Sequence, residues 1–152
     1  MITIARESPR QDDVAALIRQ SDALMQSLYP AESNHLVDID ALAAPHVHFF
    51  VAREDGRALG CGAFVVGTEK NAEMKRVFVD PAARGKGIAR LIMDALEREA
   101  ATLGIERMQL ETGIKQPEAI TLYRKFGYVE RGPFGAYKPD PLSLFMEKRL
   151  AG

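Results

Sequence analysis

The stretch Val77-Phe78-Val79-Asp80-Pro81-Ala82-Ala83-Arg84-Gly85-Lys86-Gly87-Ile88-Ala89-Arg90-Leu91 decides the fold of this chain. It joins an apolar β-type run to the start of a helix through a basic turn that contains two glycines. Pro81 has no amide proton and favours an extended residue before it, so we expect the strand to end there. The apolar residues from position 88 onward then follow helical spacing. The stretch therefore predicts a strand, a turn and a helix.

The turn itself has the composition of an anion site. Gly85 and Gly87 carry no Cβ atom, so their backbone N–H groups can approach a ligand closely. The first amides of the helix and the positive end of its dipole favour negative charge, and Arg84 and Lys86 add two cations. We therefore expect a diphosphate at the N-terminus of this helix.

Two common nucleotide-binding motifs are excluded by spacing. The Walker A pattern fails because no Ser or Thr follows the Gly85-Lys86 pair, and the G-x-G-x-x-G fingerprint of dinucleotide-binding folds is absent. An ordinary strand-to-helix turn remains the structural alternative to an anion site.

Length and composition limit the possible classes of protein. A chain of 152 residues with 47% hydrophobic content can bury a core of its own, so we expect a single domain over residues 1–152. The formal charge is −1, with 20 basic and 21 acidic residues, which argues against nucleic acid or an anionic membrane as a partner. One cysteine, Cys61, excludes an intramolecular disulfide. With no export signal or long apolar stretch, these features predict a cytoplasmic protein.

The hydrophobic pattern along the chain predicts an α/β (α+β) fold with six strands and four helices. Ser8-Pro9 reads as an N-cap followed by the first residue of a helix, and Gly104 and Gly127 read as helix ends. The expected elements are a strand at 2–5, helices at 9–28 and 36–42, strands at 48–52, 58–66 and 72–79, a helix at 86–103, a strand at 105–111, a helix at 117–126 and a strand at 142–150.

Two motifs in this order resemble a known superfamily. Arg84-Gly85-Lys86-Gly87-Ile88-Ala89 matches the pattern Arg/Gln-x-x-Gly-x-Gly/Ala, and Leu122-Tyr123-Arg124-Lys125-Phe126-Gly127-Tyr128 matches Leu-Tyr-x-x-x-Gly-Phe/Tyr. Both resemble motifs of the GCN5-related N-acetyltransferases (GNAT), whose element order is also β-α-α-β-β-β-α-β-α-β. The resemblance is specific over residues 73–128. It implies a mixed, mainly antiparallel central sheet with helices on both faces.

The resemblance also implies acetyl-CoA as co-substrate and direct acetyl transfer to an amine within a ternary complex. It assigns cofactor contacts to Val77, Phe78 and Val79 on the strand, and to the diphosphate loop. The loop residues are Arg84, Gly85, Lys86, Gly87, Ile88 and Ala89. Gln116 stands where many relatives carry Asn, and its longer amide offers the same hydrogen-bonding groups. No metal is expected, because the three histidines and the cysteine have none of the zinc spacings.

The catalytic candidates are a phenol and a carboxylate. Tyr123 is the expected general acid for the departing thiolate, against the alternative that it only packs beside Ile120 and Phe126. The amide of Val77, or one residue either side, is expected to donate to the developing oxyanion. Glu73 is the first candidate for the general base, and the alternative is a salt bridge to Lys75 or Lys70.

The acceptor is expected to contact two polar loops that carry aromatic residues. The candidate acceptor-binding residues are Tyr29, His35, Glu111, Phe134 and Tyr137. Glu111 is also the second candidate base, with Thr112 holding a relay water. Phe134 and Tyr137 either wall the acceptor pocket or cover the edge of the core.

A small-molecule amine is the expected acceptor, and a protein N-terminus or lysine stays open. The rival is a non-catalytic acetyl-CoA sensor or interaction module on the same fold. An acyl-cysteine route through Cys61 is disfavoured because no activating residue adjoins it in sequence. Dimerisation through the final strands is common in the superfamily, which leaves a homodimer as an open expectation.

Overall fold

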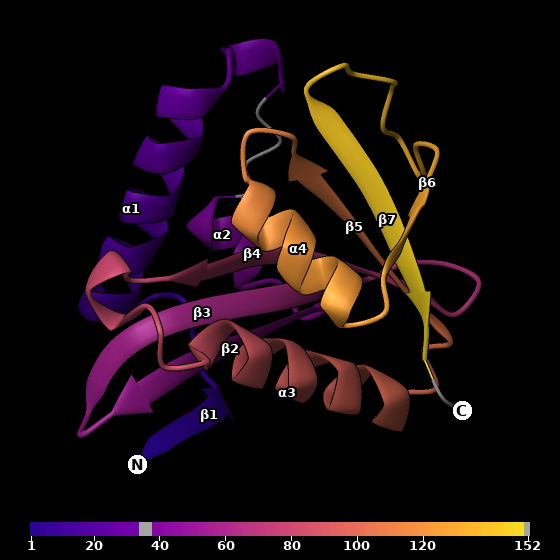
Figure 1. Ribbon diagram of the computed structural model, residues 1–152. Coiled ribbons are helices and arrows are strands. Elements are labelled where there is room, and N and C mark those ends of the chain that lie inside the picture. Colours follow the sequence, from indigo (N-terminus) through magenta and orange to yellow (C-terminus); the bar gives the residue numbers. More distant parts are fainter. Residues whose placement is uncertain (34–37, 151–152) are drawn as a thin grey trace.

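A computed structural model describes residues 1–33 and 38–150 as one seven-stranded sheet flanked by helices (Figure 1). The strand order is β1-β2-β3-β4-β5-β7-β6. The bounds of the strands are β1 Ile2–Arg6, β2 Val47–Glu54, β3 Arg57–Val66, β4 Asn71–Val79, β5 Arg107–Gly113, β6 Val129–Arg131 and β7 Ser143–Arg149. Every neighbouring pair is antiparallel except β4 and β5, which run parallel. The predicted mixed, mainly antiparallel sheet is confirmed.

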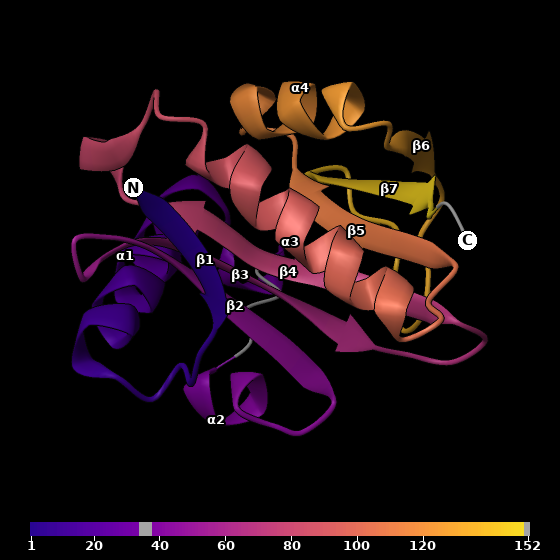
Figure 2. The same cartoon turned by 90° about the horizontal axis from the view of Figure 1, so that it is seen from below.

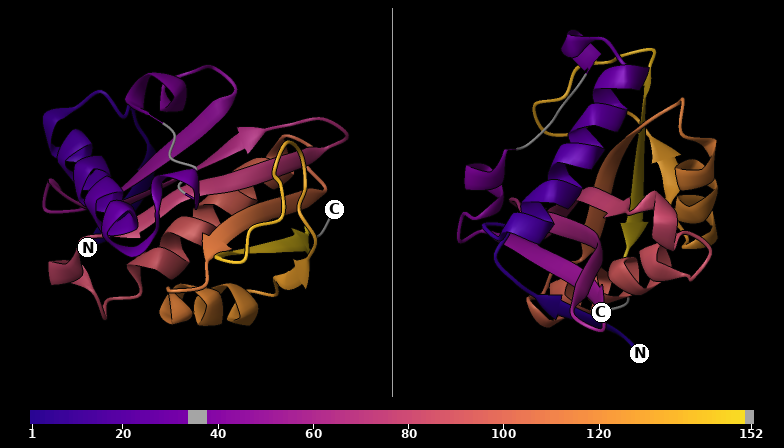
Figure 3. Two further views of the ribbon diagram at one scale, coloured as in Figure 1. Left: turned by 90° about the horizontal axis from the view of Figure 1, so that it is seen from above. Right: turned by 90° about the vertical axis from the view of Figure 1, so that its left-hand side faces the viewer.

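The helices cover both faces of this sheet, as Figures 2 and 3 show. Their bounds are α1 Asp12–Leu28, α2 Ile39–Leu42, α3 Ile88–Thr102 and α4 Pro117–Lys125, with short 3₁₀ turns at Ala31–Ser33 and Pro81–Ala83. On one face, Val14, Leu17 and Ile18 of α1 pack with Val51 and Cys61. The opposite face holds a larger core, built on α3 with α4 packed against it. A sheet buried on both faces explains why six consecutive residues of β2 are buried.

Local sequence signals account for most element boundaries. Asp55 and Gly56 both have positive φ angles, 52° and 80°, which is the two-residue turn that closes the β2–β3 hairpin. Gly104, with a φ of 80°, directly follows the C-cap residue of α3. Pro117 occupies the first turn of α4. Gly104 and Pro117 match the helix end and the helix start expected from the sequence.

Two local predictions were wrong. Ser8 does not cap α1: its hydroxyl accepts a hydrogen bond from the Arg10 amide, 3.0 Å away, and the helix begins at Asp12 after Gln11. A serine side chain can satisfy a turn instead of a helix start, and here it does so. The sequence predicted no strand between the helix at 117–126 and the strand at 142–150, but Val129–Arg131 forms β6 on β7. Three residues are too few to show a strand periodicity in the sequence.

Candidate active site

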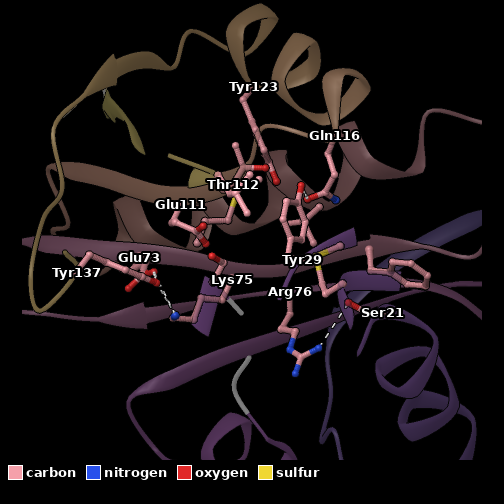
Figure 4. A pocket seen from close by; sticks show the side chains of 17 residues that line it. Ser21, Tyr29, Glu73, Lys75, Arg76, Glu111, Thr112, Gln116, Tyr123 and Tyr137 are labelled. Atoms are coloured by element: carbon pink, nitrogen blue, oxygen red, sulfur yellow. Dashed lines mark hydrogen bonds and ion pairs between the residues drawn. The ribbon is translucent and has the colours of Figure 1, made fainter. Parts of the chain in front are cut away.

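The candidate site lies where β4 and β5 separate. The two strands pair in parallel from Asn71 opposite Arg107 to Met74 opposite Leu110, and their pairing ends there. Beyond that point the strands leave a cleft of about 870 Å³, which includes the open space at its mouth. Figure 4 shows the cleft lined from α1, β4, the end of β5, the start of α4 and Tyr137. Ligands in sheets of this kind bind where neighbouring strands diverge, which makes this cleft the principal candidate.

A bulge in β4 shapes one wall of the cleft. Cys61 of β3 pairs with Phe78 and Ala63 pairs with Lys75, so one residue of β3 lies opposite two residues of β4. Arg76, one of those two, has a φ of 60°, in the left-handed region that non-glycine residues seldom adopt. The bulge interrupts the ladder where Val77 and Phe78 border the cleft.

The Arg76 side chain anchors this bulge to α1. Its guanidinium forms an ion pair with Asp22 and lies 3.5 Å from the Ser21 hydroxyl, with only 5% of the side chain exposed. A buried arginine stays charged, so its carboxylate partner offsets the cost of desolvation. This ion pair fixes the distance between β4 and the helix that forms the opposite wall.

Glu73, Lys75 and Tyr137 form a polar cluster at the far end of the cleft. The Lys75 ammonium lies 3.2 Å from a Glu73 oxygen and donates to the Tyr137 hydroxyl at 2.9 Å. That hydroxyl in turn donates to Glu73 at 2.5 Å. Burial, together with the hydrogen bond to Glu73, raises the pKa of Tyr137, so the phenol stays protonated. The cluster ties β4 to the segment between β6 and β7.

Glu111, the first β5 residue beyond the paired region, places a carboxylate beside the cleft. The Ser143 hydroxyl donates to it at 2.7 Å. Burial raises the pKa of Tyr29 and of Tyr137, and the negative charge of Glu111 contributes to both shifts. Glu111 therefore acts electrostatically on the phenols that line the cleft.

Tyr123 on α4 reaches the cleft from the opposite side of the sheet to α1 (Figure 4). Burial raises the pKa of Tyr123 to about 12, and the charge of Glu111 adds to the shift. Its ring meets that of Tyr128 edge to face, with the centroids 6.1 Å apart. The Tyr123 phenol is thus a protonated donor at neutral pH, held by aromatic packing.

The predicted diphosphate loop precedes α3. Gly85 and Gly87 have φ angles of 87° and 72°, and a Cβ atom on either would meet nothing within 4 Å. These two positions need glycine for their backbone angles and leave the surface above them open. The first hydrogen bond of the helix runs from the Leu91 amide to the Gly87 carbonyl at 3.2 Å, so the three preceding amides point out of its N-terminus.

The charges around this helix start favour an anion. α1 and α4 carry acidic residues in their first turns, as the helix dipole favours, but α3 carries none. Arg84 is exposed, and Lys86 forms an ion pair with Glu54 at 3.0 Å. The Ile88 side chain is buried in the core beneath the loop, which leaves only its backbone for a ligand.

The cleft brings together eight of the residues predicted from the sequence. They are Tyr29, Glu73, Val77, Phe78, Glu111, Gln116, Tyr123 and Tyr137. Val79 lies outside the cleft lining and pairs with Gly60 in β3. Phe134 packs edge to face on Tyr137 and Phe145 at the edge of the core, and it does not line the cleft. His35 lies outside the described residues.

The sequence did not reveal that α1 lines the cleft, nor that the two basic residues Lys75 and Arg76 of β4 do so. Ser21 and Met25 line the cleft, but in the sequence they belong to the apolar stripe of an amphipathic helix. Lys75 was predicted only as a partner of Glu73, and Arg76 was not singled out. The available signal for both was the pair of adjacent basic residues between the apolar Met74 and Val77.

Cys61 is buried and its thiol lies 3.5 Å from the Arg76 carbonyl oxygen. Burial raises the pKa of Cys61 to about 12, so the thiol is protonated and unreactive at neutral pH. Within residues 1–33 and 38–150, no three His, Cys, Asp or Glu side chains gather to ligate a metal. In the same part of the chain no helix is long and apolar enough to cross a membrane.

Comparison with known proteins agrees with this geometry. The acetyltransferase (GNAT) family model matches residues 15–128. An IAA acetyltransferase of Azospirillum brasilense is 53% identical over 150 residues, which cover 98% of each chain.

Solved structures show the same fold. A Klebsiella pneumoniae structure assigned as an acyl-CoA N-acyltransferase superposes with a TM-score of 0.84 at 38% identity, over 99% of each chain. YncA of Salmonella typhimurium, solved with its cofactor acetyl-CoA, has a TM-score of 0.73 at 23% identity over 99% of this chain and 94% of YncA. This chain therefore belongs to the GNAT family of acetyltransferases.

Proposed function

We propose that this protein transfers the acetyl group of acetyl-CoA directly to a primary amine of a small molecule, within a ternary complex. The observation that carries the proposal is that β4 connects the cleft to the glycine loop at the start of α3. β4 passes the cleft at Val77 and then leads, through Pro81–Ala83, into the open glycine loop of α3. An acyl-CoA is long enough to occupy both features, with its diphosphate on the loop and its thioester in the cleft.

The loop residues fit the diphosphate of acetyl-CoA. The amides from Gly85 to Ala89 would hold the phosphate oxygens, with Arg84 and Lys86 at the rim. The glycine positions leave the approach open, and the absence of acidic residues in the first turn of α3 leaves its positive potential for an external anion. YncA, which shares the fold, carries acetyl-CoA.

Bound acetyl-CoA would supply a thioester, an acetyl group already activated for attack by an amine. The backbone of Val77 and Phe78, beside the bulge in β4, would pair with the amide groups of the pantetheine arm and donate to the oxygen of the attacked carbonyl. Gln116, at the start of α4, would offer its side-chain amide to the same arm. Tyr123 would donate its phenolic proton to the sulfur that departs.

The acceptor amine arrives as an ammonium ion, so a carboxylate must take its proton before the nitrogen can attack. We assign this role to Glu73, whose carboxylate lines the cleft and is fixed by Lys75 and Tyr137. Glu111 is the second carboxylate at the cleft and the alternative base, with Thr112 beside it in the cleft wall. Tyr29 and Tyr137 would contact the acceptor directly, and Phe134 would support Tyr137 from behind.

The size of the cleft supports a small acceptor. The same cleft, lined from α1, β4, β5 and α4, must hold the end of the pantetheine arm as well as the acceptor. The relative from Azospirillum brasilense, which matches 98% of this chain, is named an IAA acetyltransferase. Acetylation of a protein N-terminus or lysine would need an open groove for the chain that flanks the amine.

The proposal is tested by calorimetric titration of the protein with acetyl-CoA, beside the double variant Lys86→Glu, Gly87→Asp. Wild-type binding that is lost in a folded double variant supports the loop as the diphosphate site. A screen of small amines, with release of the CoA thiol as the readout, then identifies the acceptor. Binding without turnover on any amine or peptide would favour the sensor alternative, and absence of binding would overturn the proposal.

A further inference from the structure

Tyr29 lies at the point where the two sides of the cleft meet. α1 ends at Leu28, and the extended backbone of Tyr29, with φ −131° and ψ 147°, turns its side chain across the cleft (Figure 4). The residue is 7% exposed and contributes to the cleft lining. Its ring therefore faces a wall formed by the end of β5 and the start of α4.

Three hydrogen bonds join the end of α1 to the segment that enters α4. The Tyr29 hydroxyl accepts the Lys115 amide at 3.1 Å and donates to the side-chain oxygen of Gln116 at 3.4 Å. The Lys115 ammonium donates to the Leu28 carbonyl at 2.9 Å and lies 5.9 Å from the centroid of the Tyr29 ring. Gln116 is the N-cap of α4 and makes no side-chain capping bond, so its amide is oriented by Tyr29 instead.

Gly113 fixes the position of the ring. A Cβ atom on Gly113 would lie 1.8 Å from the Tyr29 hydroxyl oxygen and 2.1 Å from the adjacent ring carbon. Any larger residue would push the ring off the end of β5 and break its hydrogen bonds. The phenol is thus held by contact on one side and by hydrogen bonds on the other.

This junction connects elements on opposite faces of the sheet. α1 packs on one core, whereas Leu122, Tyr123 and Phe126 of α4 pack against the other. The junction spans the split between β4 and β5, where no pairing of these two strands holds the wall of the cleft in register. Tyr123 lies about 1.7 turns after Pro117, the first residue of α4, so a shift at Gln116 moves the Tyr123 phenol.

From this geometry we infer that Tyr29 is a positioning residue, which couples the α1 wall to Tyr123 through Lys115 and Gln116. The inference rests on the proposed acetyl transfer, in which Tyr123 is the general acid. A displacement of about 1 Å in a catalytic group can lower the rate about 100-fold. Removing the Tyr29 hydroxyl therefore lowers kcat. It changes acetyl-CoA affinity only slightly, because it disturbs the Gln116 contact to the pantetheine arm but leaves the diphosphate loop untouched.

Four variants test this coupling. Tyr29→Phe removes only the hydroxyl, Gly113→Ala displaces the ring, and the double variant does both. Ser27→Ala is the matched control, because it removes a hydroxyl bonded to the Leu24 carbonyl in the same last turn of α1, on the solvent side. For each, we would measure acetyl-CoA affinity by calorimetry, kcat and KM for the amine found in the screen, and hydrogen exchange of the peptide 114–122.

The expected pattern is specific. Tyr29→Phe lowers kcat about tenfold, changes acetyl-CoA affinity less than about threefold and speeds exchange in 114–122. The double variant has a kcat no lower than that of the slower single variant, because both substitutions disrupt the same contacts between Tyr29 and the start of α4. Ser27→Ala matches the wild type. Tyr29→Phe is the informative variant if Gly113→Ala fails to fold.

Three results would overturn the coupling. Faster exchange with unchanged kcat means that the junction is only structural. A raised KM for the amine with unchanged kcat means that Tyr29 only contacts the acceptor. Multiplicative losses in the double variant mean that Tyr29 and Gly113 act independently. A wild type that binds no acetyl-CoA would instead overturn the proposed function, so the two failures are distinguishable.

Discussion

The Ile92 side chain of α3 lies directly over Gly62 of β3: a Cβ atom on Gly62 would be 2.6 Å from the Ile92 Cγ2 atom. Contact this close lets α3 approach the centre of the sheet, and Leu96 and Val77 close the same space at 3.3 Å. Because Gly62 has no side chain, the distance between α3 and β3 is set by the contact of Ile92 with the backbone of β3. The same contact positions α3, which follows the glycine loop, on the sheet.

Gly62→Ala should lower the free energy of unfolding by about 1–3 kcal/mol, because an added methyl group overpacks the core. Urea denaturation measures the loss. Gly132→Ala is the matched control, since a Cβ atom there meets nothing within 4 Å and its φ is not positive. Equal stability of the two variants would contradict the packing argument.

Tyr123→Phe should lower kcat at least about 100-fold, because the departing sulfur loses its proton donor. Acetyl-CoA affinity should stay within about threefold of wild type, since the ring is kept and the diphosphate loop is untouched. Steady-state kinetics and calorimetry separate the two effects. An unchanged kcat would leave Tyr123 with a packing role beside Tyr128.

Glu73→Gln and Glu111→Gln distinguish the two candidate bases. With Glu73 as base, Glu73→Gln lowers kcat/KM about 100-fold near pH 7, and the deficit shrinks as the pH rises, because the free amine then needs no base. Glu111→Gln should have the smaller effect. A larger loss in Glu111→Gln, with the same recovery at high pH, would transfer the role to Glu111. The pH dependence of kcat/KM is the readout.

Arg53 should make the stability depend on pH in the acid range. Its hydrogen bonds hold the pKa of Glu7 and of Asp13 below their ordinary values, 4.5 and 3.8. A lowered pKa in the folded state adds stability above the ordinary value, and that stability is lost as the pH falls through the folded value. Arg53→Met should therefore cost about 1 kcal/mol near pH 6 and progressively less toward pH 3.

Urea denaturation across this range checks the prediction, and Arg124→Met is its control. The Arg124–Glu130 ion pair is more than half exposed on both sides, where solvent screens its energy. A pH-independent cost in Arg53→Met would mean that the side chain stabilises the fold by packing alone.

The fold could be predicted from local features because each feature acts over a few residues. Pro81, Gly85 and Gly87 set the strand, the turn and the start of α3, and the Leu122–Tyr128 motif set the end of α4. Hydrophobic periodicity then predicted the helices and most strands. Two elements were exceptions. The start of α1 was misplaced because the polar side chain of Ser8 forms a turn, and β6 was missed because this short strand is defined by its pairing with β7.

The sequence by itself determined the GNAT fold and the glycine loop, because both follow from residue type and spacing. Through its motifs it also proposed Tyr123 and Glu73 as catalytic residues. Only the tertiary structure decided which side chains share the cleft. Tyr29, the adjacent residues Lys75 and Arg76 of β4, and Tyr137 come from three segments far apart in the chain, and all of them line the cleft where β4 and β5 separate. Contacts across such a split follow from the packing of whole elements, which no local pattern encodes.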